Sequence, residues 1–148
     1  MNKSENQITP DIQATYLAMI QQLPGVTLFQ KLYVTDEHEN RIEVTENGKL
    51  SCAFVVSSVL TIFNLIDRPH GTVAGTVREV QNMGWEKTNS PAPGDLIIWP
   101  VADGHAHIGF YLGENRCISN SGELGRPTEH QLKMSDGREP EYFLTYDF

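Results

Sequence analysis

The chemistry available to this 148-residue chain centres on a cysteine at the start of an apolar segment. Cys52 opens the stretch SCAFVVSSVLTIFNLI, which contains neither Gly nor Pro and is long for a strand. We therefore expect a helix with Cys52 in its first turn, where unpaired amides and the helix dipole favour the thiolate, the nucleophilic form of the side chain. The alternative is a small core residue without a chemical role, which is common for free cysteines.

A candidate base for this nucleophile lies in the segment GHAHIGFYLG. The period of two in a strand places His105 and His107 on the same face. One imidazole suffices as the base, and we expect it to be His107, which lies deeper in the strand and is held more rigidly. His105 sits beside Gly104 at the mouth of the strand, where we expect it to be solvated. A hydrogen-bonded core histidine without catalytic function is the competing interpretation of His107.

A Cys–His pair also needs a polar residue that fixes the tautomer of the base. The segment CISNSG offers Ser119 and Asn120, and because neighbours on a strand face opposite ways, only one of them can point at His107. We predict Asn120, whose amide oxygen could accept the ring N–H. Ser119 and His130 remain as alternatives.

A zinc site is a second possibility, because His105, His107 and Cys117 are plausible ligands. No fourth ligand has close spacing and no C-x-x-C pair is present, so we expect no metal and no cofactor. Cys117 is then a buried strand residue. Since Cys52 lies in a helix-like run and Cys117 in a strand-like run, and no export signal is visible, we expect two free thiols.

The elements that must position these residues follow from hydrophobic periodicity and turn signals. Thr9, Pro10 and Asp11 form a helix-start signal in which Thr caps the first turn. Helices followed by strands with short connections indicate an α+β fold, with N-terminal helices packed on an antiparallel sheet, in a single domain of residues 1–148. The expected helices cover residues 11–23, 51–66 and 72–83, and the expected strands cover 28–34, 96–101, 107–113, 116–120 and 141–148. Between them, DEHENRIEVTENGK reads as a solvated hairpin.

Charge and hydropathy restrict the partners. The net charge of -8 and the pI near 5.0 oppose binding to nucleic acid or to an anionic membrane surface. The N-terminal MNKSENQITPDIQ lacks the apolar stretch of a signal peptide, and no apolar run is long enough to cross a bilayer. We therefore expect a cytoplasmic protein without a nucleic-acid or membrane partner, while the oligomeric state is left open.

The order of GKLSCAFVVSSVL, PAPGDLIIW, HIGFYLG and CISNS resembles the NlpC-type and CHAP papain-like peptidases and amidases. In those families a Cys opens a buried helix, a Gly-Asp pair starts a strand, and a His begins the next strand. The similarity is strongest over residues 50–121. It implies a papain-like α+β core with Cys52 as the nucleophile, His107 as the base and the third polar residue at Ser119 or Asn120.

Two positions depart from the NlpC pattern: Ser51 stands where Asp is common, and Ser119 stands where a second His is usual. The resemblance implies hydrolysis of a peptide or amide bond, commonly in bacterial peptidoglycan or muropeptides. Reaching a cell-wall substrate from the cytoplasm would require phage lysis, a secretion system or recycled muropeptides. The alternatives are a non-catalytic binding module on the same fold, or an acyltransferase or deamidase with another substrate.

Overall fold

The computed structural model describes residues 7–148, over which the chain forms an α+β fold, as predicted. Three helices and eight strands are present in this range. Their bounds are α1 Ile12–Gln21, β1 Tyr33–Thr35, β2 Arg41–Glu43, α2 Cys52–Ile62, α3 Val73–Asn82, β3 Glu86–Thr88, β4 Leu96–Ala102, β5 His105–Gly113, β6 Arg116–Ser121, β7 Arg126–Gln131 and β8 Tyr142–Thr145.

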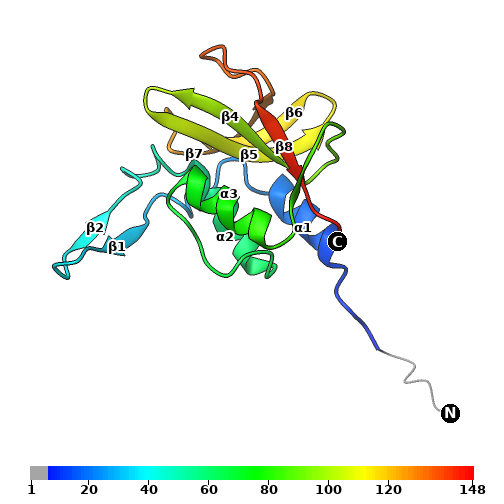
Figure 1. Ribbon diagram of the computed structural model, residues 1–148, viewed down its shortest axis with the longest axis horizontal. Helices are drawn as coiled ribbons and strands as arrows, with labels where there is room; N and C mark the ends of the chain where they lie inside the picture. Colours follow the sequence, from blue (N-terminus) through cyan, green and yellow to red (C-terminus); the bar gives the residue numbers. More distant parts are fainter. Residues whose placement is uncertain (1–6) are drawn as a thin grey trace.

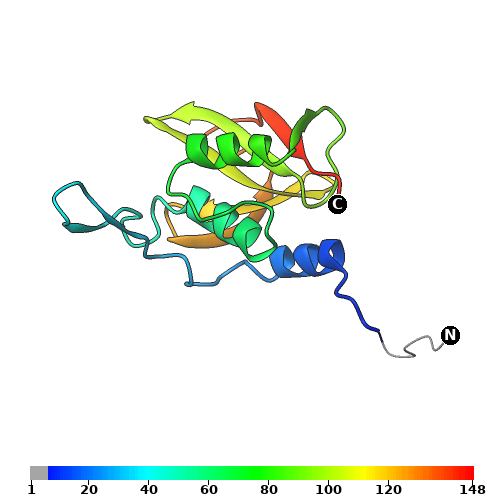
Figure 2. The same ribbon diagram turned by 60° about the horizontal axis from the view of Figure 1, so that its bottom comes forward.

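A six-stranded antiparallel sheet forms one layer, and the helices lie together on one side of it (Figures 1 and 2). The strand order is β3-β8-β4-β5-β6-β7. The main core fills the space between the helices and the sheet, and a smaller cluster around Ile97, Trp99 and Cys117 occupies the other face. Alternate residues along a strand of this sheet therefore face either the main core or the opposite face with the smaller cluster.

Helix α2 is the centre of the main core, as its apolar sequence predicts. Its buried residues are Ala53, Val55, Val56, Ser57, Val59 and Leu60. The helix ends at Ile62, four residues earlier than the expected end at Ile66. The physical reason is Asn64, which adopts a left-handed conformation with φ of 56° and so stops the helix. Ile66 stays buried, but in the loop that follows.

Two helix starts are held by side-chain caps. Thr72 accepts a hydrogen bond from the amide of Gly75, as expected for the start of α3. At α1 the cap is Asp11, which accepts from the amide of Ala14 at 3.0 Å, and not Thr9 as predicted. Asp11 directly follows Pro10, and its carboxylate oxygen accepts from a first-turn amide that has no partner within the helix.

The strand predicted over residues 28–34 is largely absent, since β1 begins only at Tyr33. Side-chain hydroxyl groups hold the preceding backbone instead: Ser51 Oγ donates to the carbonyl oxygen of Phe29, and Thr45 Oγ1 donates to that of Gln30. These two hydrogen bonds take up carbonyl groups that a neighbouring strand would otherwise pair with. Residues 28–32 therefore form a loop that is fixed to the body of the protein by side chains.

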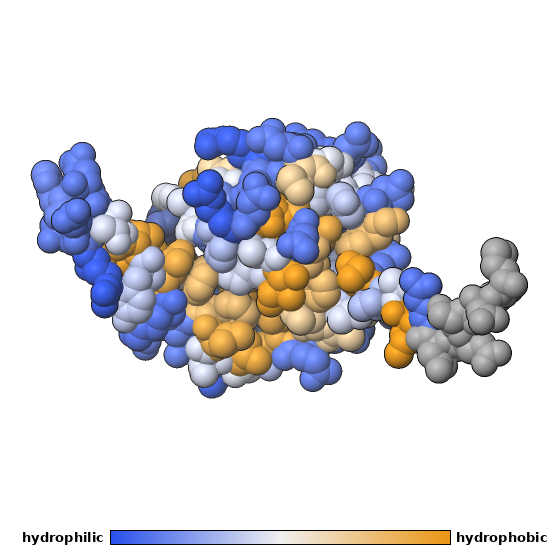
Figure 3. Space-filling view, turned by 90° about the horizontal axis from the view of Figure 1, so that it is seen from below, coloured by the Kyte–Doolittle hydropathy of each residue, from blue (hydrophilic) through white to orange (hydrophobic). Residues whose placement is uncertain are grey.

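The β1–β2 hairpin projects away from the sheet and helices, in agreement with the predicted solvated hairpin (Figure 1). Its turn is ordered by Asp36, whose carboxylate accepts from the amides of His38 and Asn40. Figure 3 views the helical side and shows hydrophilic residues over this hairpin, with apolar residues gathered on the body beside it. Exposed apolar side chains include Leu28 and Ile62. In the described range, no helix has the length and apolar character required to cross a membrane.

Candidate active site

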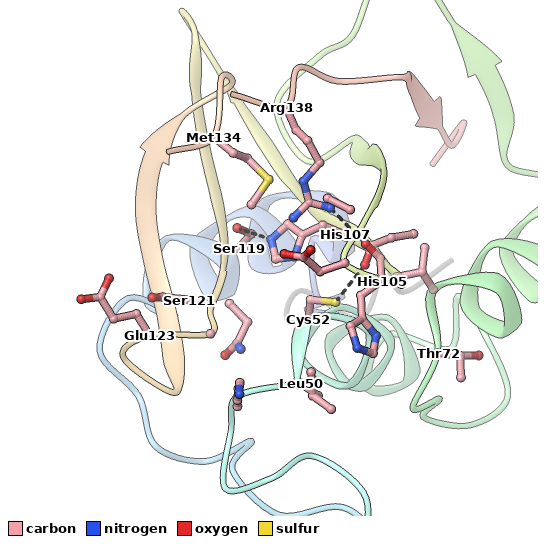
Figure 4. Close-up of a pocket in the computed structure, with 18 of the residues that line it drawn as sticks. Leu50, Cys52, Thr72, His105, His107, Ser119, Ser121, Glu123, Met134 and Arg138 are labelled. Atoms are coloured by element: carbon pink, nitrogen blue, oxygen red, sulfur yellow. Dashed lines mark hydrogen bonds between the residues drawn. The ribbon is translucent and has the colours of Figure 1, made fainter. Parts of the chain in front are cut away.

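The first residue of α2, Cys52, lies at the wall of a cavity of about 1060 Å³ (Figure 4). Its sulfur is 4.0 Å from the carbonyl oxygen of Ala106. The main-chain amide of Ile108 also faces the sulfur, so the thiol rests against the backbone of β5 on both sides of position 107. This stretch of β5 is open because its pairing with β6 stops at Gly109 opposite Ser119.

His107 lies on β5 and lines the same cavity as Cys52. Only 9% of the residue is exposed, and its ring packs 5.2 Å from the indole of Trp99. Nε2 is hydrogen-bonded to Ser119 Oγ at 2.8 Å. The ring nitrogen left for the thiol is therefore Nδ1, and the described residues 7–148 show no hydrogen bond between Cys52 and His107. Such catalytic bonds commonly tighten only when substrate is bound.

Ser119 connects His107 to a second histidine. Its hydroxyl oxygen is 2.5 Å from Nε2 of His130, which lies on the neighbouring strand β7. The other ring nitrogen of His130, Nδ1, lies 2.7 Å from the carbonyl oxygen of Gln131. The ring of His130 also packs against Trp99, with centroids 5.8 Å apart. The structure thus places two of the three candidate orienting residues, Ser119 and His130, in one hydrogen-bonded chain with the base.

Asn120 does not contact His107, contrary to the prediction that its amide faces the imidazole. Its side chain is buried and donates from Nδ2 to the carbonyl oxygen of Gly48 at 2.7 Å. Adjacent strand residues point to opposite faces, and the register of β6 against β5 turns Ser119 toward His107. Asn120 instead ties β6 to the loop that precedes α2.

The remaining candidates take peripheral or structural positions. His105 is exposed at the rim of the cavity, as expected. Cys117 is fully buried, and both cysteines are free thiols. Cys117 Sγ lies 3.3 Å from the main-chain oxygen of His130. Within residues 7–148, no group of three His, Cys, Asp or Glu side chains is arranged to hold a metal ion.

Burial sets the protonation states of the pair. It lowers the pKa of His107 to about 3, and the nearby positive charge of Arg138 acts in the same direction. Burial also raises the pKa of the Cys52 thiol, and this effect outweighs the helix-start amides of Cys52 and Ala53, which lower the pKa. The helix start therefore favours the thiolate, as expected, but burial opposes it more strongly, so the net shift of the Cys52 pKa is upward.

Arg138 is a site residue that the sequence interpretation missed. It lines the cavity, and Figure 4 shows its guanidinium beside His107. Nε donates to Asp136, while Nη1 donates to the carbonyl oxygens of Pro100 and His105. No periodicity or motif marks this arginine, because it lies in a polar loop between β7 and β8 and reaches the site only through the fold.

The fold and the site together define a papain-like cysteine hydrolase architecture, in which the cysteine opens the central helix and the histidine lies on the adjacent sheet. The model of the NlpC/P60 family matches residues 32–138, so the chain belongs to the NlpC/P60 family. This match reaches beyond the predicted range of 50–121, and it includes the β1–β2 hairpin and Arg138. No curated protein matches the chain. Membership supports a cysteine peptidase or amidase type of function on substrates related to the cell wall.

Proposed function

We propose that this protein is a thiol hydrolase that cleaves an amide bond in peptidoglycan or muropeptides, with Cys52 as the nucleophile and His107 as the base. The observation that carries the proposal is the presence of both side chains on the wall of one large cavity, with the sulfur against the strand that bears the imidazole. Family membership supports the same class of reaction.

In the proposed reaction the Cys52 sulfur attacks the carbonyl carbon of the scissile amide while its proton passes to Nδ1 of His107. Because burial opposes charge on both groups at rest, proton transfer accompanies attack rather than preceding it. His107 then protonates the leaving amine as the carbon–nitrogen bond breaks. Water, deprotonated by His107, hydrolyses the resulting thioester and restores the thiol.

The start of α2 provides donors for the negatively charged oxygen of the tetrahedral intermediate. Ser51 is the N-cap residue, yet its hydroxyl group donates to Phe29 and makes no capping bond to the helix. The first-turn amides therefore lack a side-chain cap, and they are available to the oxyanion. Because position 51 is a Ser and not an Asp, no carboxylate at the helix start opposes the negative charge of the oxyanion.

The charges around the cavity support a substrate that carries carboxylates. Although the protein is acidic overall, the cavity lining contains three cationic side chains, Lys49, Lys133 and Arg138, against the two acidic ones of Asp103 and Glu123. Cell-wall stem peptides bear free carboxylates, so this local excess of positive charge favours them. We propose Arg138 as the main contact, since its guanidinium is already held in place by three acceptors.

Incubation with purified peptidoglycan and with soluble muropeptides tests the proposal, with mass spectrometry to detect new amines and stem peptides. The wild-type protein and the matched control Cys117→Ala are expected to release products, whereas Cys52→Ala releases none. Product release by Cys52→Ala, or failure of the wild type on every amide substrate, would refute the thiol mechanism. Preference for the polymer or for muropeptides distinguishes an extracellular from a cytoplasmic substrate.

A further inference from the structure

A line of polar side chains runs from β5 through β6 to β7 and ends on a main-chain carbonyl group. It consists of His107, Ser119 and His130, followed by the carbonyl oxygen of Gln131. We infer that His130 is a positioning residue that acts through Ser119 to hold the proton of His107 on Nε2, which leaves Nδ1 free to accept the proton of Cys52. The inference rests on the proposed function, and it assigns a role to a residue outside the Cys–His pair.

The direction of each hydrogen bond follows from the last acceptor. A carbonyl oxygen can only accept, so Nδ1 of His130, at 2.7 Å from Gln131, carries the proton. A neutral imidazole has a single N–H, so Nε2 of His130 must accept, and the hydroxyl proton of Ser119 points to it. The oxygen of Ser119 has no further proton to give. It therefore accepts from His107, whose Nε2 must bear the hydrogen.

These hydrogen-bond directions require both imidazole rings to be neutral, and the burial of the two rings favours the neutral form. Burial lowers the pKa of both His107 and His130. The sulfur of Cys117 also lies 3.5 and 3.6 Å from Nδ1 and Nε2 of His130, but both ring nitrogens have closer oxygen partners, Gln131 at 2.7 Å and Ser119 at 2.5 Å. The thiol can donate its proton to the main-chain oxygen of His130 at 3.3 Å instead. Both histidines are then neutral near pH 7, and the tautomer of each is determined.

Packing holds the line in place. The indole of Trp99 lies against the rings of both His107 and His130, and its Nε1 donates to the carbonyl oxygen of Leu132. Gly109 allows Ser119 to approach, because a Cβ at this position would lie only 2.8 Å from the Cβ of Ser119. The hydroxyl group of Ser119 thus has little freedom to select other partners.

Removal of His130, which accepts the proton of Ser119, should release the tautomer of His107. In His130→Leu, Ser119 regains a free proton and can donate it to Nε2 of His107, which then carries its own hydrogen on Nδ1 and cannot accept from Cys52. We expect kcat/KM to fall roughly tenfold, which corresponds to the net free energy of a typical hydrogen bond. His130→Gln offers an amide oxygen to Ser119 and should remain within about threefold of the wild type, a recovery that a purely packing role would not predict.

The test combines a double-mutant cycle with NMR of the full-length protein. Long-range ¹H–¹⁵N spectra are expected to show His107 with its hydrogen on Nε2 in the wild type and in His130→Gln, and a mixture of tautomers in His130→Leu. In the Ser119→Ala background, His130→Leu should cause no further loss of kcat/KM, because its effect passes through the missing hydroxyl group.

A further loss of kcat/KM when His130→Leu is added to Ser119→Ala would overturn the inference. An Nδ1–H tautomer of His107 in the wild type would also overturn it. An unchanged tautomer of His107 in His130→Leu would overturn it as well. The NMR measurement requires no substrate, so it tests the role of His130 even if the protein does not cleave the proposed cell-wall substrates. Inactivity of the wild type would count against that reaction alone.

Discussion

The stability of the folded protein should decrease between pH 7 and pH 5 because His107 is buried in its neutral form. An unfolded chain exposes this imidazole with its ordinary pKa of 6.5, whereas burial lowers the pKa to about 3 in the folded protein. Between these two values the unfolded state binds a proton that the folded state does not. Stability therefore rises with pH in this window and is lost as the pH falls below about 6.5.

The two pKa values of His107 give the size of the effect. At pH 7 the side chain reduces the free energy of unfolding by only about 0.2 kcal/mol, and at pH 5 the reduction reaches about 2 kcal/mol. For a chain of this length, such a difference corresponds to a drop in Tm of roughly 4–8 °C. The carboxylate pKa values that the fold lowers, including that of Glu43 at about 2, govern stability only at lower pH.

Urea unfolding at pH 7 and at pH 5 measures this difference, with His107→Gln as the control. Glutamine keeps a hydrogen-bonding group but does not titrate, and all other ionisable groups are common to both proteins. We expect the wild type to lose about 2 kcal/mol more than His107→Gln on acidification. Equal losses in the two proteins would refute the idea that His107 is held neutral by burial.

Three further predictions concern packing, thiol reactivity and helix capping. Gly109→Ala should lower the free energy of unfolding by about 1–3 kcal/mol, because its Cβ would lie 2.7 Å from a main-chain oxygen of β6. In Gly71→Ala the new atom meets only side-chain carbons, those of Leu32 at 3.3 Å and Val44 at 3.7 Å, and an equal loss there would contradict the packing argument. Iodoacetamide should alkylate Cys52 selectively and faster as pH rises, while burial raises the pKa of Cys117 to about 12 and protects it; mass spectrometry showing equal labelling would contradict this. Thr72→Ala should cost about 1 kcal/mol in thermal unfolding, since it removes the cap of α3, and an unchanged Tm would show that the cap contributes nothing.

Local patterns in the sequence were sufficient for the elements that carry the nucleophile and the base. The apolar segment after Cys52 predicts a buried helix with this residue in its first turn, and the structure confirms it. Likewise, HIGFYLG predicts the strand that carries His107. These features depend on periodicity within one segment, and their burial follows from the same apolar residues. The helix end at Ile62 was less predictable, because it depends on the backbone conformation of Asn64.

The partners of the base depend on contacts between segments that no local pattern encodes. Strand alternation shows that either Ser119 or Asn120 faces His107, but the choice is made by the register of β6 against β5 and by the acceptor that Gly48 offers to Asn120. Strand β7 has no apolar alternation and forms by pairing with β6, which brings His130 to Ser119.

The protonation state of the pair also depends on burial. A helix start lowers the pKa of a cysteine, and this much can be inferred from position alone. The opposing cost of removing Cys52 and His107 from water depends on how many atoms surround them after folding, and here that cost is the larger one. Periodicity along one segment thus identifies the reactive residues, whereas their orientation and charge follow from the packing of segments that are distant in the chain.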